Sequence, residues 1–216
     1  MKLARMLVVC AVAVAPAAMA QRWEFGGGAG GGFYTSQDVS APAGSAAAKI
    51  QSNVAAGVWL DNNGRGRWGG EARYDYQRGA LQLSSGGTQA AFGAETHALH
   101  YDMLWHAAPS GARVRPFVAA GGGVKVYRGT GAEVVFQPLG NFALLTKARD
   151  LTALVSVGAG VKMQLTPRLQ LRLDFHDYLT PFPKQVIAPN VGSKVGGWLQ
   201  DFVPMVGLSY TSTPGE

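Results

Sequence analysis

Apolar and polar side chains alternate along most of this chain, and the stretch from Arg168 to His176 shows the pattern best. Its odd positions are apolar, whereas its even positions are charged or polar. Because successive residues of a β-strand point to opposite faces, this spacing predicts a strand with one hydrocarbon face and one polar face. Such a strand fits a soluble sheet packed on a core, or a transmembrane barrel with its apolar face toward lipid.

Seven further stretches alternate in the same way, so the sequence predicts eight strands. The stretch 150–165 is the longest, with apolar residues at every odd position from 151 to 165. The first stretch carries glycine at alternate positions, which would make room in a narrow lumen or allow tight curvature. Trp59 is an irregularity, because it falls on the polar face of its strand. The expected strands are 23–34, 49–60, 67–77, 94–106, 113–127, 150–165, 168–178 and 198–210.

The connections between these strands alternate between long and short. The long ones are 35–48, 78–93, 128–149 and 179–197, and the short ones are turns at 61–66, 107–112 and 166–167. Outer-membrane barrels have short periplasmic turns and longer outer loops. An exported chain enters from the periplasm, so its first loop is expected to be external, and the observed order fits.

The N-terminus predicts a cleaved secretory signal peptide at residues 1–20, followed by one barrel domain at 21–216. Lys2 and Arg5 precede an apolar run, and Ala18-Met19-Ala20 has the form of a cleavage site. The only cysteine, Cys10, lies in this run. Beyond it no apolar run reaches the ~18 residues of a membrane-spanning helix. The formal net charge of +6 is scattered along the chain, so no nucleic-acid partner is expected.

The two faces of the strands favour a membrane barrel over a soluble one, because a soluble barrel would expose rows of Leu and Val to water. A barrel of eight strands is just wide enough for side chains to fill. Buried charges are tolerable there if they pair, so a plugged lumen is expected. The lumenal ion-pair network is predicted to comprise Glu24, Glu71, Arg73, Asp75, Asp102, Arg115, Lys125, Lys162, Arg168, Arg172, Asp174 and Asp201. The lipid-facing residues are predicted to include Leu151, Val155, Val157, Val161, Leu169, Leu171, Leu173 and Phe175, and the interfacial aromatics Trp23, Trp68, Tyr76, Trp105, Trp198 and Tyr210.

The chain resembles the small outer-membrane β-barrel superfamily that contains the OmpA and OmpX transmembrane domains. The glycine-rich stretch from Trp23 to Tyr34, the strand from Arg115 to Val124 and the strand from Leu171 to Tyr178 carry the resemblance. It implies an all-β fold, an eight-stranded antiparallel up-and-down transmembrane barrel in the outer membrane of a Gram-negative-type bacterium. The partners it implies are membrane lipid, lipopolysaccharide and the barrel-assembly machinery, with a monomeric barrel.

Some members of the superfamily modify lipid A, so the resemblance also raises the question whether this chain has catalytic residues. Glu95 and His97 share the outward face of their strand, and a serine of Ser84-Ser85 could approach them through the loop. The catalytic interpretation is weaker than the alternative, in which Glu95 and His97 are polar residues that lie in the headgroup zone of the membrane. No catalytic residue is therefore expected.

Metal and cofactor sites are not expected either, because the inward residues His100, Asp102 and His106 are spread along one strand, His176 lies on another, and three or four would have to converge. The sequence thus predicts a structural or surface-interaction barrel with a plugged polar lumen, which binds through its external loops if it binds at all. A membrane enzyme acting on lipid A or phospholipid and a narrow pore remain the alternatives.

Overall fold

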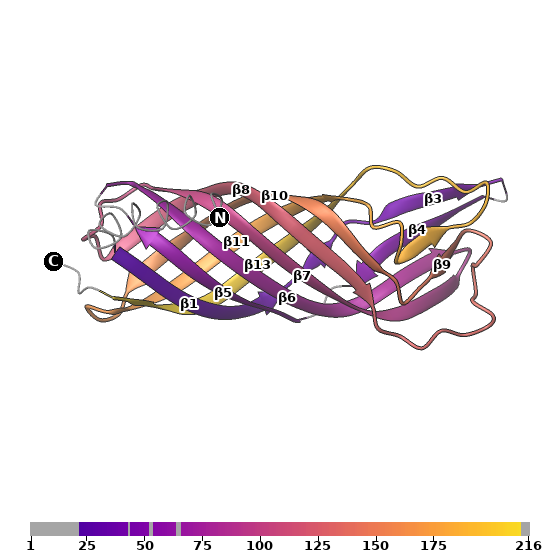
Figure 1. The fold of residues 1–216 in the computed structure, drawn as a ribbon, viewed down its shortest axis with the longest axis horizontal. Coiled ribbons are helices and arrows are strands. Elements are labelled where there is room, and N and C mark those ends of the chain that lie inside the picture. The colour runs from indigo at the N-terminus through magenta and orange to yellow at the C-terminus, as the bar shows by residue number, and fades with distance from the viewer. Residues whose placement is uncertain (1–21, 43, 52–53, 64–65, 213–216) are drawn as a thin grey trace, which may run out of the picture.

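Eight antiparallel strands close into a ring in the order β1–β5–β6–β7–β8–β10–β11–β13, and β13 returns to β1 (Figure 1). The computed structural model describes residues 22–42, 44–51, 54–63 and 66–212. The expected signal peptide at 1–20 lies outside these ranges. Among the described residues, no helix is long and apolar enough to cross a membrane. The ring confirms the predicted all-β, up-and-down barrel.

Short turns join the strands of the ring at one end. At the other end a two-residue turn joins β6 to β7, and longer segments with their own strands make the remaining connections. The ring strands are β1 (Arg22–Gly31), β5 (Val54–Asn63), β6 (Trp68–Ser85), β7 (Thr88–His106), β8 (Val114–Gly129), β10 (Arg149–Gln164), β11 (Leu169–Pro181) and β13 (Trp198–Thr211). The remaining strands are β2 (Phe33–Tyr34), β3 (Gln37–Ala41), β4 (Gly44–Gln51), β9 (Ala143–Leu145) and β12 (Ile187–Pro189).

Beyond the ring, strands continue into an extension at the end opposite the short turns (Figure 1). The segment 78–93 was expected to be a polar loop, but β6 and β7 run through it as one ladder up to the pair Ser85–Thr88. A two-residue turn joins them, with Gly86 at φ 55° and Gly87 at φ 81°. Positive φ at both positions is the hairpin turn that matches the twist of the strands, and glycine adopts it without strain.

The first, third and fourth of the long connections, which were expected to be loops, also add strands to the extension. β3 and β4 form a hairpin that pairs with the outer part of β6. The predicted strand 49–60 is therefore two strands, because its first residues belong to β4 and only its later ones to β5 in the ring. β9 and β12, from the third and fourth long connections, pair with each other.

Glycines of β1 and β13 make room for the side chain of Trp59, which points inward and is 3% exposed. A Cβ at Gly28 would come within 3.1 Å of the Trp59 ring, and one at Gly26 or Gly207 would come closer still. Trp59 Nε1 donates a hydrogen bond to Ser209 Oγ at 2.9 Å. The alternating glycines of the first strand thus leave the space that the inward ring of Trp59 occupies, which accounts for both irregularities in the sequence.

Pro204 lies opposite a break in the seam between the first and last strands. The register pairs Gly30 with Met205 and Phe33 with Phe202, so the alignment is continuous although no ladder pair forms between them at Gly31 or Gly32. Proline cannot donate a ladder hydrogen bond. The seam therefore interrupts its pairing at this point without a bulge.

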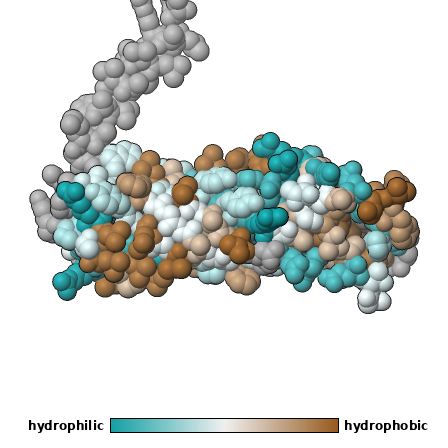
Figure 2. Space-filling view, turned by 90° about the horizontal axis from the view of Figure 1, so that it is seen from below, coloured by the Kyte–Doolittle hydropathy of each residue, from teal (hydrophilic) through white to brown (hydrophobic). Residues whose placement is uncertain are grey.

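The outward face of the ring is apolar, and Figure 2 shows hydrophobic residues gathered over the barrel, with more hydrophilic ones over much of the extension. Leu151, Val155, Val157 and Phe175 are exposed on this face. Toward the extension, the outward positions change to Arg78, Ser84 and similar polar residues, which are also exposed.

We expect Leu173→Arg to destabilise the barrel in lipid vesicles by ~2–4 kcal/mol, because it places a charge on the lipid face near the middle of β11. Leu173 is 41% exposed and points outward. The measurement is the urea dependence of the gel-mobility shift between folded and unfolded protein. Ser84→Arg is the control, since Ser84 is exposed on the extension, and it should leave the midpoint nearly unchanged. Equal effects of the two variants would contradict a lipid-facing β11.

Candidate functional site

The lumen near the turn end holds a lysine between two carboxylates. Lys162 of β10 donates to Glu24 Oε2 of β1 at 2.8 Å and also bonds Asp61 of β5. Asn63 Nδ2 donates to the same Glu24 oxygen at 2.9 Å. These side chains are all buried, so the ammonium group is compensated on the far side of the barrel from its own strand.

Two arginines fill the middle of the lumen and share the carboxylate of Asp174. Arg172 Nε donates to Asp174 Oδ2 at 2.6 Å, and Arg73 Nη1 donates to the same oxygen at 3.0 Å. Arg172 also bonds Glu71, while Arg73 Nε bonds Asp75 at 3.0 Å. All five residues are buried. Charge-assisted bonds of this kind link β6 with β11, which lie on opposite sides of the ring.

Aromatic rings cover the faces of both guanidinium groups. The Arg172 Cζ lies 4.7 Å from the ring centre of Trp59 and 4.8 Å from that of Phe117. The Arg73 Cζ lies 5.2 Å from Trp59. Cation–π contacts are stronger where water is excluded, so Trp59 stabilises the two charges whose planar faces cannot hydrogen-bond.

A second ion pair occupies the upper lumen, toward the extension. Lys125 of β8 bonds Asp201 of β13, and Gln77 Nε2 donates to the same carboxylate at 2.6 Å. The Lys125 ammonium lies 4.7 Å from the ring centre of Tyr34 and 5.4 Å from that of Tyr178. An aromatic cage thus surrounds the uppermost lumenal cation.

Asp102 organises a hydrogen-bonded chain between the two ion-paired zones. It accepts from His100 Nδ1 at 3.0 Å and from Ser156 Oγ at 3.0 Å. His100 Nε2 lies 3.0 Å from the hydroxyl of Tyr178, which in turn bonds Asp75. This chain joins the arginine cluster through Asp75, and the contact of the Lys125 ammonium with the Tyr178 ring continues it to the upper ion pair.

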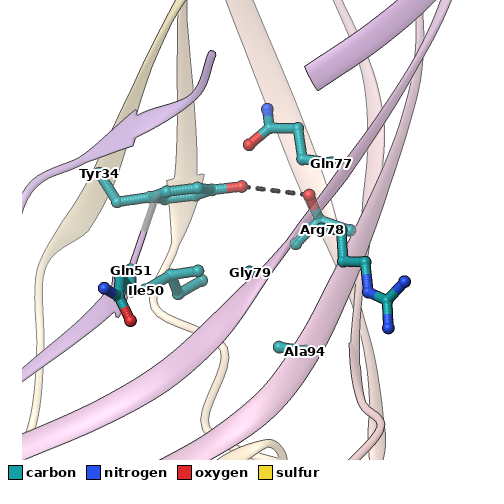
Figure 3. A pocket seen from close by; sticks show the side chains of 8 residues that line it. Tyr34, Ile50, Gln51, Gln77, Arg78, Gly79 and Ala94 are labelled. Carbon is teal, nitrogen blue, oxygen red and sulfur yellow. Dashed lines mark hydrogen bonds between the residues drawn. The ribbon is translucent and has the colours of Figure 1, made fainter. Parts of the chain in front are cut away.

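Above this polar zone the interior becomes apolar. We call the cluster of buried apolar side chains in this part of the interior the apolar cap. Some of its members lie on the ring strands β6, β7, β8 and β13. The others lie on β3, β4, β9 and β12 and on the segments beside them. The boundary lies where Tyr34 Oη bonds Thr96 Oγ1 at 3.1 Å, beside Gln77, Ile50 and Ala94 (Figure 3). The buried members of the cap are Val39, Ala46, Ala48, Ile50, Leu81, Leu83, Ala90, Phe92, Ala94, Tyr127, Phe142, Ala143, Leu145, Phe182, Val186, Ile187, Val195 and Leu199.

Most residues predicted for the lumenal network lie buried in the interior, but Arg168 does not. Arg168 is exposed at the turn end, where its Nη1 donates to the hydroxyl of Tyr210 at 3.2 Å. The prediction was wrong because Arg168 precedes β11, whose ladder begins at Leu169. Arg115 is buried and bonds carbonyl oxygens of the turns, at 3.4 Å to Ala108 and 3.5 Å to Gly66. The remaining buried members are Glu24, Glu71, Arg73, Asp75, Asp102, Lys125, Lys162, Arg172, Asp174 and Asp201.

Asp61 is the network member that the sequence reading missed. Its position in a cluster of turn residues hid it, although it has the same parity as the inward Trp59. β5 continues to Asn63, so Asp61 is a strand residue that faces the lumen.

The residues predicted to face lipid point outward on β10 and β11. Leu151, Val155, Val157, Leu173 and Phe175 are exposed. Val161, Leu169 and Leu171 are half-buried. The predicted interfacial aromatics lie at two levels: Trp23, Trp68, Trp105 and Tyr210 toward the turns, and Tyr76 and Trp198 toward the extension.

Glu95 and His97 lie on the outer surface of β7, away from Ser84 and Ser85. His97 Nδ1 bonds the hydroxyl of Tyr74 at 2.7 Å, and Glu95 Oε1 accepts from Arg128 at 3.1 Å. Ser84 and Ser85 are at the tip of the β6–β7 hairpin, far along the ladder from the pair Arg78–Glu95. The candidate catalytic set is therefore not assembled, because the expected loop is a paired hairpin that holds both serines at its tip.

The closed ring, with a hydrocarbon exterior and a filled, charged interior, defines a transmembrane β-barrel. The chain belongs to the family of outer membrane protein beta-barrel domains, whose family model matches residues 6–188. The predicted resemblance and the location in the outer membrane are thereby confirmed. The short turns accordingly face the periplasm, and the extension faces the exterior.

Solved structures with the same fold include OprG from Pseudomonas aeruginosa, at 11% identity and a TM-score of 0.59, covering 90% of this chain and 97% of that one. Ail, the attachment invasion locus protein of Yersinia pestis, has 9% identity, a TM-score of 0.47 and coverages of 89% and 99%. The outer membrane protease OmpT from Escherichia coli has 9% identity, a TM-score of 0.48 and coverages of 88% and 96%. The likeness to OprG, at this low identity, shows the fold alone. No curated protein matches the sequence.

We expect Arg172→Ala to destabilise the folded barrel by ~3–5 kcal/mol, because it leaves the buried carboxylates of Asp61, Glu71 and Asp174 without a shared cation. The measurement is urea unfolding in vesicles, followed by tryptophan fluorescence. Arg168→Ala is the matched control and should change the midpoint little, since Arg168 is exposed. A loss at Arg172 no larger than that at Arg168 would contradict the network.

Proposed function

We propose that this protein is a non-catalytic outer-membrane barrel of structural or surface-interaction type, whose lumen does not conduct ions and whose external segments carry any specific binding. The observation that supports this most is the filled interior. Side chains from opposite walls bond across the polar lumen, and the apolar cap follows above it. An ion would have to break several charge-assisted bonds and then cross a hydrocarbon layer.

The extension offers a surface for binding. Val134, Val135 and Phe136 lie in the segment between β8 and β9 and are largely exposed, and Phe136 is 81% exposed. Val191, between β12 and β13, is also almost fully exposed. Exposed apolar groups on the outer side of a membrane protein are common where a protein meets a partner. Hydrophobic residues are visible at the far end of the extension in Figure 2.

Catalysis receives less support from the exterior polar residues. His97 is held by Tyr74, and Glu95 is held by Arg128, so each has a structural partner. A nucleophile within hydrogen-bond reach of the base is the first requirement for acyl transfer. The serines considered for that role lie at the tip of the hairpin.

Phosphorylated lipid is the partner that the barrel wall fits best. Arg78, Glu95, Arg128 and Arg149 are paired in register across β6, β7, β8 and β10, and together they form an outward charged row. Arg128 and Arg149 are directly opposite each other and exposed. Like charges opposite each other are destabilising in a sheet. Glu95 compensates Arg128, and a bound phosphate would compensate Arg149. The row is directly above the apolar belt, at the level of lipid headgroups such as those of lipopolysaccharide.

We expect the purified protein to give no steady ion-conducting steps in planar bilayers, because its lumen is closed by bonded side chains. Recording at both voltage polarities, with a known porin as the positive control, checks this. Reproducible single-channel steps from the wild-type protein would contradict the closed lumen and favour a narrow pore.

We expect the double variant Arg128→Ala/Arg149→Ala to retain less lipopolysaccharide through detergent extraction and purification than the wild-type protein. The measurement is phosphate per barrel, and added salt should weaken retention in the wild type because the contact is ionic. Arg113→Ala is the control, since Arg113 is an exposed arginine beside a periplasmic turn. Equal retention in all three proteins would contradict a headgroup site on the charged row.

A further inference from the structure

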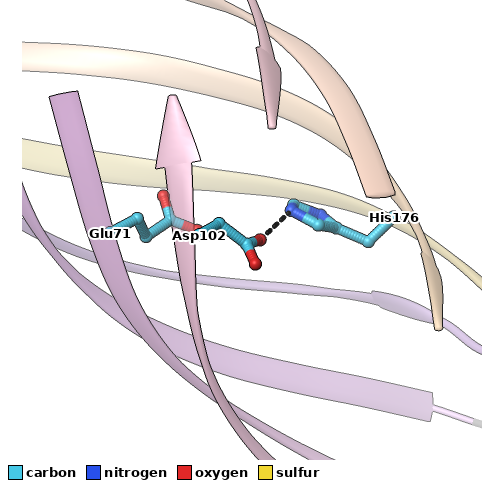
Figure 4. Close-up of side chains that lie close together, drawn as sticks. All are labelled: Glu71, Asp102 and His176. Carbon is cyan, nitrogen blue, oxygen red and sulfur yellow. Dashed lines mark ion pairs between the residues drawn. The ribbon is translucent and has the colours of Figure 1, made fainter. Parts of the chain in front are cut away.

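Three side chains from different walls of the barrel converge in the polar lumen. Glu71 of β6, Asp102 of β7 and His176 of β11 each offer one oxygen or nitrogen, and these atoms all lie within 4.8 Å of one another (Figure 4). All three residues are fully buried. Histidine and carboxylates brought together from separate strands are a set of ligands that a divalent cation can use.

The convergence includes polar atoms without hydrogen-bond partners among the described residues. Glu71 Oε1 and both ring nitrogens of His176 make no hydrogen bond. The neighbouring His100 differs, because Asp102 and Tyr178 bond its two nitrogens. Buried polar atoms without a partner are costly, and in native proteins they often mark a site completed by water or an ion.

The charge balance of the lumen points the same way. Among the described residues, the ion-paired clusters below Lys125 contain six carboxylates and three lysine or arginine side chains, and the histidines His100 and His176 also lie beside these carboxylates. Counting Arg115 at the periplasmic end as a fourth cation still leaves an excess of two negative charges. With both histidines neutral, as ligation of a metal by His176 requires, this excess of buried carboxylate is left for a bound cation to compensate. The carboxylates are Glu24, Asp61, Glu71, Asp75, Asp102 and Asp174, and the basic residues are Arg73, Lys162 and Arg172.

We propose that Glu71, Asp102 and His176 bind one divalent transition-metal cation of the zinc class inside the barrel. A tetrahedral Zn²⁺ with bonds of ~2.0–2.1 Å places neighbouring ligand atoms ~3.4 Å apart. His176 Nε2 and Asp102 Oδ2 are 3.5 Å apart, which matches this spacing. Imidazole nitrogen with carboxylate oxygen suits zinc and similar metals better than magnesium or calcium.

The third ligand, Glu71, can turn toward the cation because its neighbour has other partners. Arg73 Nη1 lies 3.5 Å from Glu71 Oε1, and Arg73 also bonds Asp75 and Asp174 at 3.0 Å. Glu71 Oε2 stays bonded to Arg172. The cation would connect β6 and β7 to β11 across the ring. Its role would be to hold in place the side chains that fill the lumen. The histidines alone did not predict this site, because only one of them takes part.

The test is to refold the protein into detergent with Zn²⁺ present, remove free metal with a chelating resin, and count bound zinc by mass spectrometry. Metal supplied during folding needs no later path into the closed lumen. Wild-type protein should retain about one zinc per barrel, whereas His176→Ala and Asp102→Asn should bind at least tenfold more weakly. His97→Ala is the matched control, because His97 lies on the outer surface, and it should retain zinc like the wild type.

The gel-mobility shift on boiling verifies that each variant is folded. If His176→Ala fails to fold, Glu71→Gln and the visible spectrum of the Co²⁺-loaded wild type provide the test, because cobalt bound by nitrogen and oxygen ligands shows d–d bands that change with the ligand set. Absence of zinc from the folded wild type would overturn the proposal. Equal zinc retention in His176→Ala, or a zinc loss in His97→Ala as large as in His176→Ala, would also overturn it.

Discussion

A β-strand without a bulge cannot change which of its residues point inward, and the rest of this structure depends on that constraint. β6 and β7 keep one alternation from the periplasmic turns to the tip of their hairpin, while their surroundings change from lipid to water. Within the membrane, the outward residues must be apolar and the inward ones can be polar. Outside it, the requirement reverses, so Leu81, Leu83 and Phe92 point inward in the extension. The apolar cap and the polar lumen are thus two segments of the same inward face.

In the membrane half of that inward face, every buried charge must be paired. A charge in a barrel this narrow has little water to solvate it, so each must find its partner on another strand. Trp59 contributes in a different way, by covering guanidinium faces that hydrogen bonds cannot reach. Its size requires the glycines that face it from both sides of the seam. The small residues of the first strand are therefore a consequence of two arginines, Arg73 on β6 and Arg172 on β11, each of which lies two strands away from β1 on either side.

Much of the barrel could be predicted from the sequence because alternation with period two is a local signal. The lipid-facing row of β11 and the inward position of Arg172 follow directly from it. What could not be predicted depends on distant partners. Residues 78–93 lack a long apolar run, and only Leu81 and Leu83 alternating with Gln82 and Ser84, followed by Gly86-Gly87, indicated a hairpin. Arg168 and Asp61 were misjudged at strand ends, where the ladder with a neighbour decides which residues belong to the strand. The grouping of Glu71, Asp102 and His176 depends on the diameter of the ring, which no local pattern specifies.

The tight Gly86-Gly87 turn has a consequence for how the chain folds. It joins the two longest strands of the ring through a loop of two residues, so their entire ladder can form by zipping from one end with little loss of chain entropy. The seam between β1 and β13 instead joins residues near the two ends of the described chain, and its pairing is interrupted opposite Pro204. Because contacts between distant residues form slowly, the β6–β7 hairpin is the natural first element to form and the seam is the natural last one. The Gly86-Gly87 turn and Pro204 thus favour an assembly that begins at the β6–β7 hairpin and ends at the seam between β1 and β13.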